Sequence, residues 1–258
     1  MELTIAFISV LFIGLSTASP HSRIVCGQNA KKGSAPYIAS LQEKDEENGV
    51  QKLFHFCGGA ILNDKWILTA AHCFRHRPDK EIFAAVGLTK LTEGGEIYKM
   101  EKYIAHENYD HYDIINDIAL LKVEGNIKFS EKVSPVILGK EFVGSGIQLT
   151  LNGWGVLGEG ANATIPSNKL QVMHPKSLSF DECVSYHYRP VRETQICAMA
   201  KKGTSACSGD SGGPLIMDKN TLVGLVSWGM HPCGNGYYPD VYTRITSYLD
   251  WIEQNMID

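Results

Sequence analysis

After residue 15, this 258-residue sequence has no long hydrophobic run. A helix that crosses a bilayer needs about 20 consecutive apolar residues, and the apolar run from Ile5 to Leu15 is shorter than that. Followed by the small residues Ser16 and Ala18, it predicts a secretory signal peptide cleaved after Ala18. The first four residues lack the usual positive charge, so an uncleaved anchor is the alternative. We expect a secreted, extracellular protein with no membrane segment after signal removal.

The sequence also has no excess of positive charge. Lys and Arg number 24 and Asp and Glu 28, for a formal net charge of −4. This balance provides no basic surface for nucleic acid or an anionic membrane. The acidic stretch at 43–47 (EKDEE) is predicted to be a solvated loop. No repeat or low-complexity segment marks a linker, and the length fits one large β domain or two smaller ones.

Closely spaced cysteine pairs are missing as well. None of the seven cysteines is separated from another by the two to four residues that zinc clusters usually require, so a zinc site is not favoured. In an exported chain, seven cysteines instead predict disulfides with one thiol left over. The residues alone do not determine the pairing.

Short apolar runs rich in β-branched and aromatic residues recur along the chain, separated by turns that contain Gly, Pro or Asn. This pattern predicts an antiparallel all-β structure with long loops. The predicted strands are 37–41, 66–69, 83–86, 118–123, 147–151 and 222–228. A helical period is clear only at the C-terminus, where Leu249, Ile252 and Met256 share a face, Ser247 is the expected N-cap and Asp250 favours the first turn.

Three short segments contain side chains suited to nucleophilic catalysis. Residues 209–214 (GDSGGP) place Ser211 in a glycine-rich turn, 69–73 (TAAHC) contain His72, and 116–121 (NDIALL) contain Asp117. Taken singly, each side chain is explained by packing or by a turn. Together, in the order His, Asp, Ser, they resemble the trypsin/chymotrypsin family of serine endopeptidases.

The resemblance extends from the Ile-Val pair at 24–25 to the sequence DVYTR at 240–244. It implies an all-β fold of two six-stranded antiparallel β-barrels with the active site between them and a C-terminal helix. The boundary between the barrels is expected near 139–143. It also implies a hydrolase with protein or peptide substrates, protein inhibitors as further partners, and no cofactor.

The resemblance implies a role for each of these side chains. Ser211 is the expected nucleophile, His72 the general base, and Asp117 the group that orients His72. The backbone N–H groups of Gly209 and Ser211 are expected to form the oxyanion hole, since Gly209 has no side chain to obstruct the approach.

A zymogen junction is expected at the start of the mature chain. The implied segments are a signal peptide (1–18), an activation propeptide (19–23) and a peptidase domain (24–258). A trypsin-like protease would cut after Arg23, and the freed amine of Ile24 would pair with Asp210 to order the site. The alternative is that Arg23 is a basic residue of a flexible tail.

The resemblance also implies a disulfide pairing, with Cys26 left as a free or intermolecular thiol. A thiol packed in the core is the alternative for Cys26, and we expect a monomer unless it links two chains. The implied bridges are Cys57–Cys73, Cys183–Cys197 and Cys207–Cys233. Asn162 begins the sequon NAT and is a predicted glycosylation site. Residues 88–90 lack the acidic ligands of the family's calcium loop, so no metal is expected.

The implied substrate pocket lies between the segments around Ser205 and around Ser227, Trp228 and Gly229. Ser205 at its floor favours large apolar side chains, and Gly229 leaves the entrance open. Asp240 adds a carboxylate, so we expect basic side chains to be accepted beside large apolar ones. A carboxylate neutralised by hydrogen bonds, and a preference for small residues, are the alternatives.

Two other functions are compatible with parts of the sequence. A non-catalytic homologue that binds proteins would not need the complete set of His72, Asp117 and Ser211. An esterase of the α/β-hydrolase type would carry its triad in the order Ser, Asp, His, which this chain does not. His55 and His231 lie beside cleft-forming segments, where packed or solvated histidines are the expectation.

Overall fold

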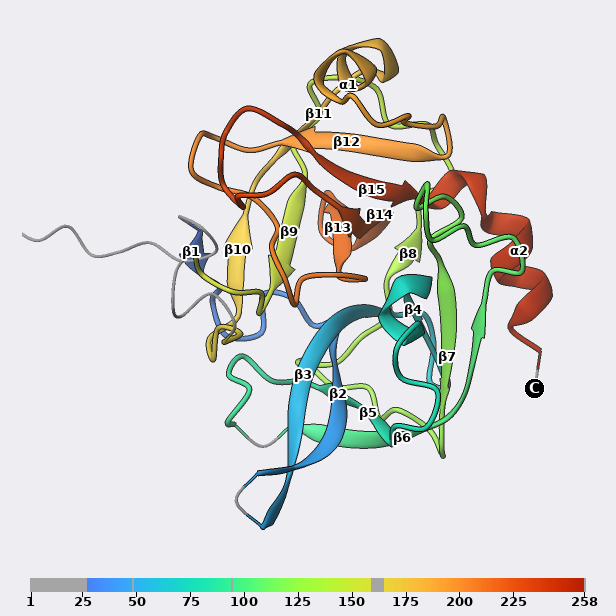
Figure 1. Ribbon diagram of the computed structural model, residues 1–258. Coiled ribbons are helices and arrows are strands. Elements are labelled where there is room, and N and C mark those ends of the chain that lie inside the picture. The colour runs from blue at the N-terminus through green and yellow to red at the C-terminus, as the bar shows by residue number, and fades with distance from the viewer. Residues whose placement is uncertain (1–26, 48, 94, 159–164, 258) are drawn as a thin grey trace, which may run out of the picture.

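The computed structural model describes residues 27–257, apart from residues 48, 94 and 159–164 (Figure 1). The predicted signal peptide, the activation junction at Arg23 and Ile24, the thiol of Cys26 and the sequon at Asn162 lie outside the described residues. Within the described part of the chain, no helix is long and apolar enough to cross a membrane.

The first half of the chain forms a closed antiparallel barrel (Figure 1). Its interior is filled by apolar side chains, among them the fully buried Leu41, Ile61, Ile67 and Leu121. The strands, in barrel order, are β2 (Ile38–Glu47), β3 (Val50–Ile61), β4 (Trp66–Thr69), β7 (Ala119–Val123), β6 (Glu96–Ala105) and β5 (Ile82–Val86), which pairs with β2 again. Closure leaves no unpaired sheet edge in this half.

The second half forms a curled nine-stranded sheet above the barrel in Figure 1. Its strands, in order, are β1 (Gln28–Asn29), β10 (Gln171–Met173), β9 (Thr150–Gly153), β13 (Pro214–Met217), β14 (Thr221–Trp228), β15 (Asp240–Arg244), β12 (Gln195–Met199) and β11 (Lys176–Ser177), with β8 (Ile137–Leu138) parallel to β14. The predicted all-β class is confirmed. The second half differs from the predicted six-stranded barrel, because its sheet has nine strands. Three of them, β1, β8 and β11, have only two residues each.

Most of the predicted strands coincide with observed ones, but the predicted helix start is wrong. Residues Ile245–Ser247 form the 3₁₀ turn η2, and α2 (Leu249–Asn255) begins after Tyr248 without a side-chain cap. Ser247 therefore still belongs to the preceding turn. Asp250 does lie in the first turn of α2, as expected.

One helix was not predicted from the sequence. α1 (Phe180–Tyr186) begins with a capping box, in which Ser179 Oγ accepts from the N–H of Glu182 and the Glu182 carboxylate accepts from the N–H of Ser179. The Ser-x-x-Glu spacing at 179–182 is the signal for this start, although seven residues are too few for a clear apolar period.

The two halves share a core. Buried Trp66 and Leu68 of the barrel belong to the same apolar cluster as Ile216 and Leu225 of the sheet. The C-terminal segment reinforces the junction, because Trp251 Nε1 of α2 donates to Glu107 of the first half at 3.0 Å. The segments that bear the candidate catalytic residues are therefore held at a fixed seam.

The acidic stretch 43–47 is part of β2 and not the expected loop. Cations of the segment before β5 pair with two of its carboxylates, and Lys44 within the stretch pairs with Glu81, which Lys99 of β6 also contacts. The ion pairs are Glu43–Arg77 at 2.7 Å, Asp45–Lys80 at 3.3 Å and Lys44–Glu81–Lys99 at 3.1 and 3.0 Å. Charge compensation of this kind lets acidic residues stay in a paired hairpin.

Three disulfides link the described cysteines: Cys57–Cys73, Cys183–Cys197 and Cys207–Cys233. These are the pairings that the resemblance implies. They close loops of 16, 14 and 26 residues, and each contributes about 3 kcal/mol by restricting the unfolded chain.

Candidate active site

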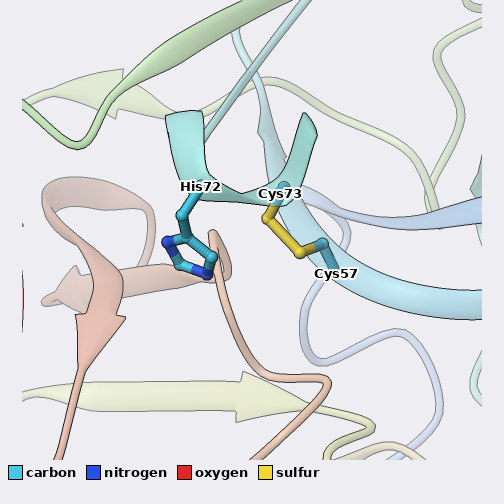
Figure 2. Close-up of side chains that lie close together, drawn as sticks. All are labelled: Cys57, His72 and Cys73. Atoms are coloured by element: carbon cyan, nitrogen blue, oxygen red, sulfur yellow. A yellow bond between two sulfur atoms is a disulfide. The ribbon is translucent and has the colours of Figure 1, made fainter. Parts of the chain in front are cut away.

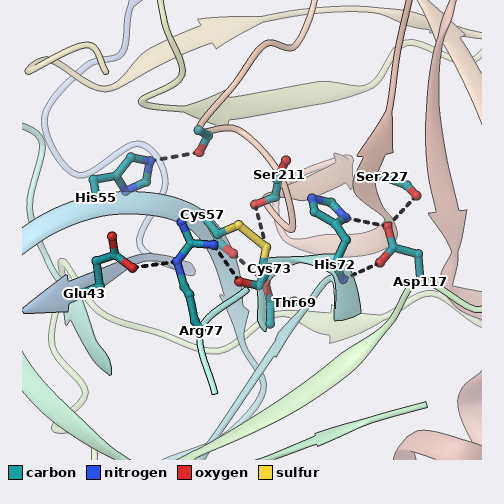
Figure 3. Close-up of a disulfide and its surroundings, with 12 residues drawn as sticks. Glu43, His55, Cys57, Thr69, His72, Cys73, Arg77, Asp117, Ser211 and Ser227 are labelled. Atoms are coloured by element: carbon teal, nitrogen blue, oxygen red, sulfur yellow. Dashed lines mark hydrogen bonds and ion pairs between the residues drawn. A yellow bond between two sulfur atoms is a disulfide. The ribbon is translucent and has the colours of Figure 1, made fainter. Parts of the chain in front are cut away.

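The partly buried His72 forms a hydrogen bond with the buried Asp117 at the seam between the two halves (Figure 3). His72 Nδ1 lies 2.7 Å from Asp117 Oδ2, and the His72 backbone N–H donates to Asp117 Oδ1 at 2.9 Å. Ser227 of β14 donates its hydroxyl to Asp117 Oδ2 at 2.6 Å. Three donors therefore fix the carboxylate, which is 1% exposed, and it fixes the imidazole in turn.

The local structure around His72 explains its orientation. His72 lies in the 3₁₀ turn η1 (Ala71–Phe74), next to the disulfide between Cys73 and Cys57 of β3 (Figure 2). Burial lowers the pKa of His72, but the charge and the hydrogen bond of Asp117 together outweigh it, so that the pKa lies above its usual value. His72 is thus a base whose protonated form is stabilised by its neighbour.

Among the described residues, two places bring His together with cysteines at metal-ligand distances, but they do not offer thiolate ligands. The groups are Cys57, His72 and Cys73, and Cys183, His187 and Cys197. In both, the two sulfur atoms are bonded to each other as a disulfide, which leaves one imidazole. A single nitrogen is too few for the four ligands of a structural zinc site.

Ser211 lies in the loop before β13, on the opposite side of the His72 ring from Asp117 (Figure 3). The loop is held by backbone hydrogen bonds from Gly58 N to Ser211 O at 2.8 Å and from Gly212 N to Val226 O at 2.8 Å. Among the described residues, no hydrogen bond joins Ser211 Oγ to His72. Catalytic hydrogen bonds are often longer without substrate and shorten in the complex.

The backbone N–H groups of Gly209 and Ser211 donate to no described residue, whereas the N–H of Asp210 between them donates to Cys207 O at 2.9 Å. Gly209 adopts φ +98°, a conformation that side chains disfavour. The loop thus leaves two N–H donors beside the Ser211 hydroxyl, which is the arrangement that stabilises an oxyanion.

The Asp210 carboxylate is buried directly beneath this loop. It accepts from Gly155 N at 2.8 Å and from Cys207 N at 3.0 Å, and it is 1% exposed. Burial raises its pKa to about 6, against the opposing effect of those two hydrogen bonds. A carboxylate in this position would gain from a cation brought to it.

A cavity of about 190 Å³ opens beside Ser211. The predicted pocket residues Ser227, Trp228, Gly229 and Asp240 all line it, and so does His231. Ser205 instead lines a smaller adjoining cavity of about 10 Å³, which Asp240 also borders. Asp240, unlike Ser205, therefore brings a carboxyl group to the lining of the larger cavity.

The environment of Asp240 controls its charge. Its Oδ2 accepts from Ala206 N at 2.8 Å. Burial raises the pKa of Asp240 to about 7. The hydrogen bond from Ala206 lowers the pKa, whereas the charge of the nearby Asp210 raises it further. Asp240 therefore changes charge near neutral pH.

His55 is a packed histidine and does not reach the cavity. Its Nδ1 lies 2.8 Å from Ser40 Oγ and its Nε2 2.9 Å from Gly209 O, and burial lowers its pKa to about 4. It is thus a neutral ring that holds the loop of Gly209 from below. The sequence around His55 contains no local signal for its contact with Gly209, which is 154 residues away.

Comparisons with known proteins agree with this geometry. A sequence model of the trypsin family matches residues 24–252. Chymotrypsin-2 of Vespa crabro is 35% identical over 235 residues, which are 91% of this chain and all of that protein. Trypsin-1 of Salmo salar is 33% identical over 98% of both chains, and trypsin theta of Drosophila melanogaster is 32% identical over 93% of this chain and 90% of its own.

The closed barrel and the curled sheet, together with the family match, define a serine endopeptidase, a hydrolase of peptide bonds that acts on protein substrates. The chain belongs to the trypsin family.

Proposed function

We propose that this protein cleaves peptide bonds with the triad Ser211, His72 and Asp117 through an acyl-enzyme. The observation that carries the proposal is the His72–Asp117 pair at 2.7 Å, fixed by Ser227, next to a serine flanked by two unpaired backbone N–H groups. Each of the three catalytic tasks then has a group in place: attack, proton transfer and stabilisation of the oxyanion.

In this mechanism, Ser211 Oγ attacks the scissile carbonyl while His72 takes its proton. Asp117 holds His72 in the tautomer whose Nε2 is the free base, and it stabilises the imidazolium that forms. The N–H groups of Gly209 and Ser211 bind the oxyanion. His72 then gives the proton to the leaving amine, and water releases the acyl group by the same steps.

The test is turnover of chromogenic peptides by the activated protein and by a Ser211→Ala variant. We expect the variant to lose about 10⁴- to 10⁶-fold in kcat and to keep its fold. Substantial hydrolysis by the purified variant would contradict the triad. No hydrolysis by the wild type would favour a non-catalytic, protein-binding homologue instead.

We further propose that the chain is secreted and made as a zymogen. The signal-like run at its start supports export, with the protein extracellular after cleavage at Ala18. A trypsin-like activator would cut after Arg23, and the new amine of Ile24 would pair with Asp210. The buried Asp210 carboxyl supports this step, because an ammonium would relieve the cost of its charge.

The same proposal includes the features that lie outside the described residues. We propose a peptidase domain at 24–258, with the boundary between its halves near 139–143, after β8. Cys26 is proposed as the thiol without an intramolecular partner, and Asn162 as a glycosylation site. The enzyme is a monomer in this proposal unless Cys26 links two chains.

For specificity, we propose cleavage after large apolar residues, with basic residues accepted as well. The cavity walls formed by Trp228, Gly229 and Met230 suit an extended side chain. Asp240 in the cavity lining would attract a Lys or Arg when it is charged.

A further inference from the structure

The loop that leads into Asp117 has a strained backbone. Ile114 has φ +52° and Asn116 has φ +55°, both in the left-handed region that side chains disfavour. Asn tolerates this region better than most residues, whereas a β-branched residue such as Ile rarely adopts it. A strained backbone persists only where surrounding contacts hold it, and such strain is concentrated at functional sites. The contacts of residues 114–117 therefore matter for the position of the Asp117 carboxylate.

Two buried hydroxyl groups of the second half hold this loop of the first half. Thr243 of β15 donates to the backbone carbonyl oxygen of Asp117 at 2.7 Å. Tyr248, which directly precedes α2, donates to Asn116 Oδ1 at 2.9 Å. The other end of the Asn116 amide donates to the carbonyl oxygen of Asn108 at 2.8 Å, so both ends of this side chain are fixed. Because Thr243 and Tyr248 are buried, water does not compete for these bonds.

The two donors come from parts of the fold that are themselves fixed. Thr243 lies inside the sheet, where it pairs with Gln195 of β12 on one side and Leu225 of β14 on the other. The ring of Tyr248 belongs to the apolar core that the two halves share. Gln195 Nε2 donates to the carbonyl oxygen of Ile114 at 2.9 Å and holds the loop at a third point. Movement of the loop would leave these buried donors without acceptors, which is unfavourable.

These bonds act on Asp117 at a different point from the bond of Ser227. Ser227 contacts the carboxylate itself (Figure 3), whereas Thr243 contacts the backbone of the same residue. The 2.7 Å hydrogen bond between the carboxylate and His72 Nδ1 weakens when either partner is displaced. The charge of Asp117 raises the pKa of His72, and that of Arg77 lowers it. A displacement of the Asp117 backbone would therefore lower the pKa of His72.

We propose that Thr243 and Tyr248 are positioning residues, which hold the strained segment 114–117 so that the Asp117 carboxylate meets His72. Both act through Asp117 and not on the substrate, and the inference rests on the proposed function. Because the two donors belong to the second half and Asp117 to the first, the geometry of the catalytic base depends on how the two halves pack. Removal of either donor lets the loop relax and the carboxylate move away from the imidazole.

The test measures peptide turnover over a range of pH for Thr243→Val and Tyr248→Phe, each of which removes one hydroxyl group at nearly constant side-chain volume. We expect kcat to fall about 10- to 100-fold and KM to stay within about twofold. The acid limb of the kcat/KM profile should move to lower pH, because a more distant Asp117 raises the pKa of His72 less. Thr243→Ser keeps the donor and should retain the wild-type kcat and acid limb.

Tyr37→Phe is the matched control, because the buried hydroxyl of Tyr37 also donates to an Asn side chain, Asn152 Oδ1 at 3.3 Å. It should leave kcat and the acid limb unchanged. Urea unfolding shows whether each variant is folded, and Tyr248→Phe provides the test by itself if Thr243→Val is not.

Two results would overturn this inference alone. One is an acid limb that stays in place in the folded Thr243→Val and Tyr248→Phe variants, whatever their kcat, because a merely structural role would leave the pKa of His72 unchanged. The other is an equal shift in Thr243→Ser or Tyr37→Phe. Failure of the activated wild type to hydrolyse any peptide would instead overturn the proposed function.

Discussion

At the scale of single residues, the site depends on how neighbours set the charge of three ionisable side chains. Asp117 raises the pKa of His72, whereas burial raises the pKa of Asp210 and of Asp240. From residue type alone, the pKa of each carboxyl would be expected near its ordinary value. In the proposed function, the shift of His72 bears on catalysis, that of Asp210 on activation and that of Asp240 on specificity.

The activity should rise with pH through the raised pKa of His72, because only the neutral imidazole is a base. Asp117→Asn removes the charge that raises this pKa. We expect kcat to fall about 10⁴-fold and the acid limb of the kcat/KM profile to move to lower pH. An acid limb that stays in place would show that Asp117 does not control the protonation of His72.

Asp240 should make specificity depend on pH. Its pKa of about 7 means that the side chain is mostly neutral at pH 6 and mostly charged at pH 8. The ratio of kcat/KM for matched Arg and Phe substrates should therefore rise between these values. Asp240→Gly should lower the ratio and make it independent of pH. Equal ratios for the two proteins at pH 8 would mean that Asp240 does not attract the substrate's charge.

At the scale of elements, the loop that carries Ser211 is shaped by close packing against the first barrel. Gly212 adopts φ +72°, and a Cβ there would lie 2.1 Å from Thr69 Oγ1 of β4 and 2.8 Å from Gly58 O of β3. Thr69 donates its hydroxyl to that same carbonyl at 2.8 Å. No side chain fits between these groups. The packing of the loop against the barrel wall therefore requires glycine at position 212.

Gly212→Ala should destabilise the protein by about 2 to 4 kcal/mol, because it combines backbone strain with a steric overlap. Urea unfolding would measure the change. Gly144→Ala is the control, since its Cβ would have no neighbour within 4 Å and its φ is not in the left-handed region. A Gly212→Ala variant as stable as Gly144→Ala would show that the loop adapts without cost.

At the scale of the whole molecule, burial of two carboxyls at the seam links folding to pH. A carboxyl whose pKa is higher in the folded protein than in the unfolded chain favours folding while it is protonated. That stability is present below the unfolded value of 3.8 and is lost as pH rises through about 6 for Asp210 and about 7 for Asp240. The uncut precursor should therefore become less stable from pH 5 to pH 8.

We expect the free energy of unfolding of an uncut precursor, held inactive by Arg23→Gln, to fall by about 2 to 4 kcal/mol over this range. Adding Asp240→Asn should make the fall smaller. Urea unfolding at a series of pH values measures both. A fall of the same size in both proteins would show that Asp240 is not protonated in the folded precursor.

The same Arg23→Gln precursor tests activation. Incubation with a trypsin-like protease should leave it inactive, whereas the wild type gains activity as its chain is cut. Peptide turnover and mass analysis of the new N-terminus follow both events. Full activity of the uncut variant would refute the proposed switch.

The sequence by itself determined the features that are local. Runs such as 66–69 and 222–228 predicted β4 and most of β14, since short apolar runs rich in β-branched residues favour strands over a few positions. The order of His72, Asp117 and Ser211, with the family resemblance, predicted a catalytic triad, which stays a prediction. The family resemblance added the three disulfide pairings.

Only the tertiary structure decided what depends on packing between distant segments. Ser227 donates to Asp117, 110 residues away in the sequence, and Arg189 donates to Tyr112, 77 residues away. The loop that carries Ser211 packs against Thr69. No periodicity records such contacts, because they arise when the barrel and the sheet pack at their shared core. The acidic stretch at 43–47 was mispredicted for the same reason, because strand pairing and ion pairs with segments elsewhere in the chain outweighed its local preference for a loop.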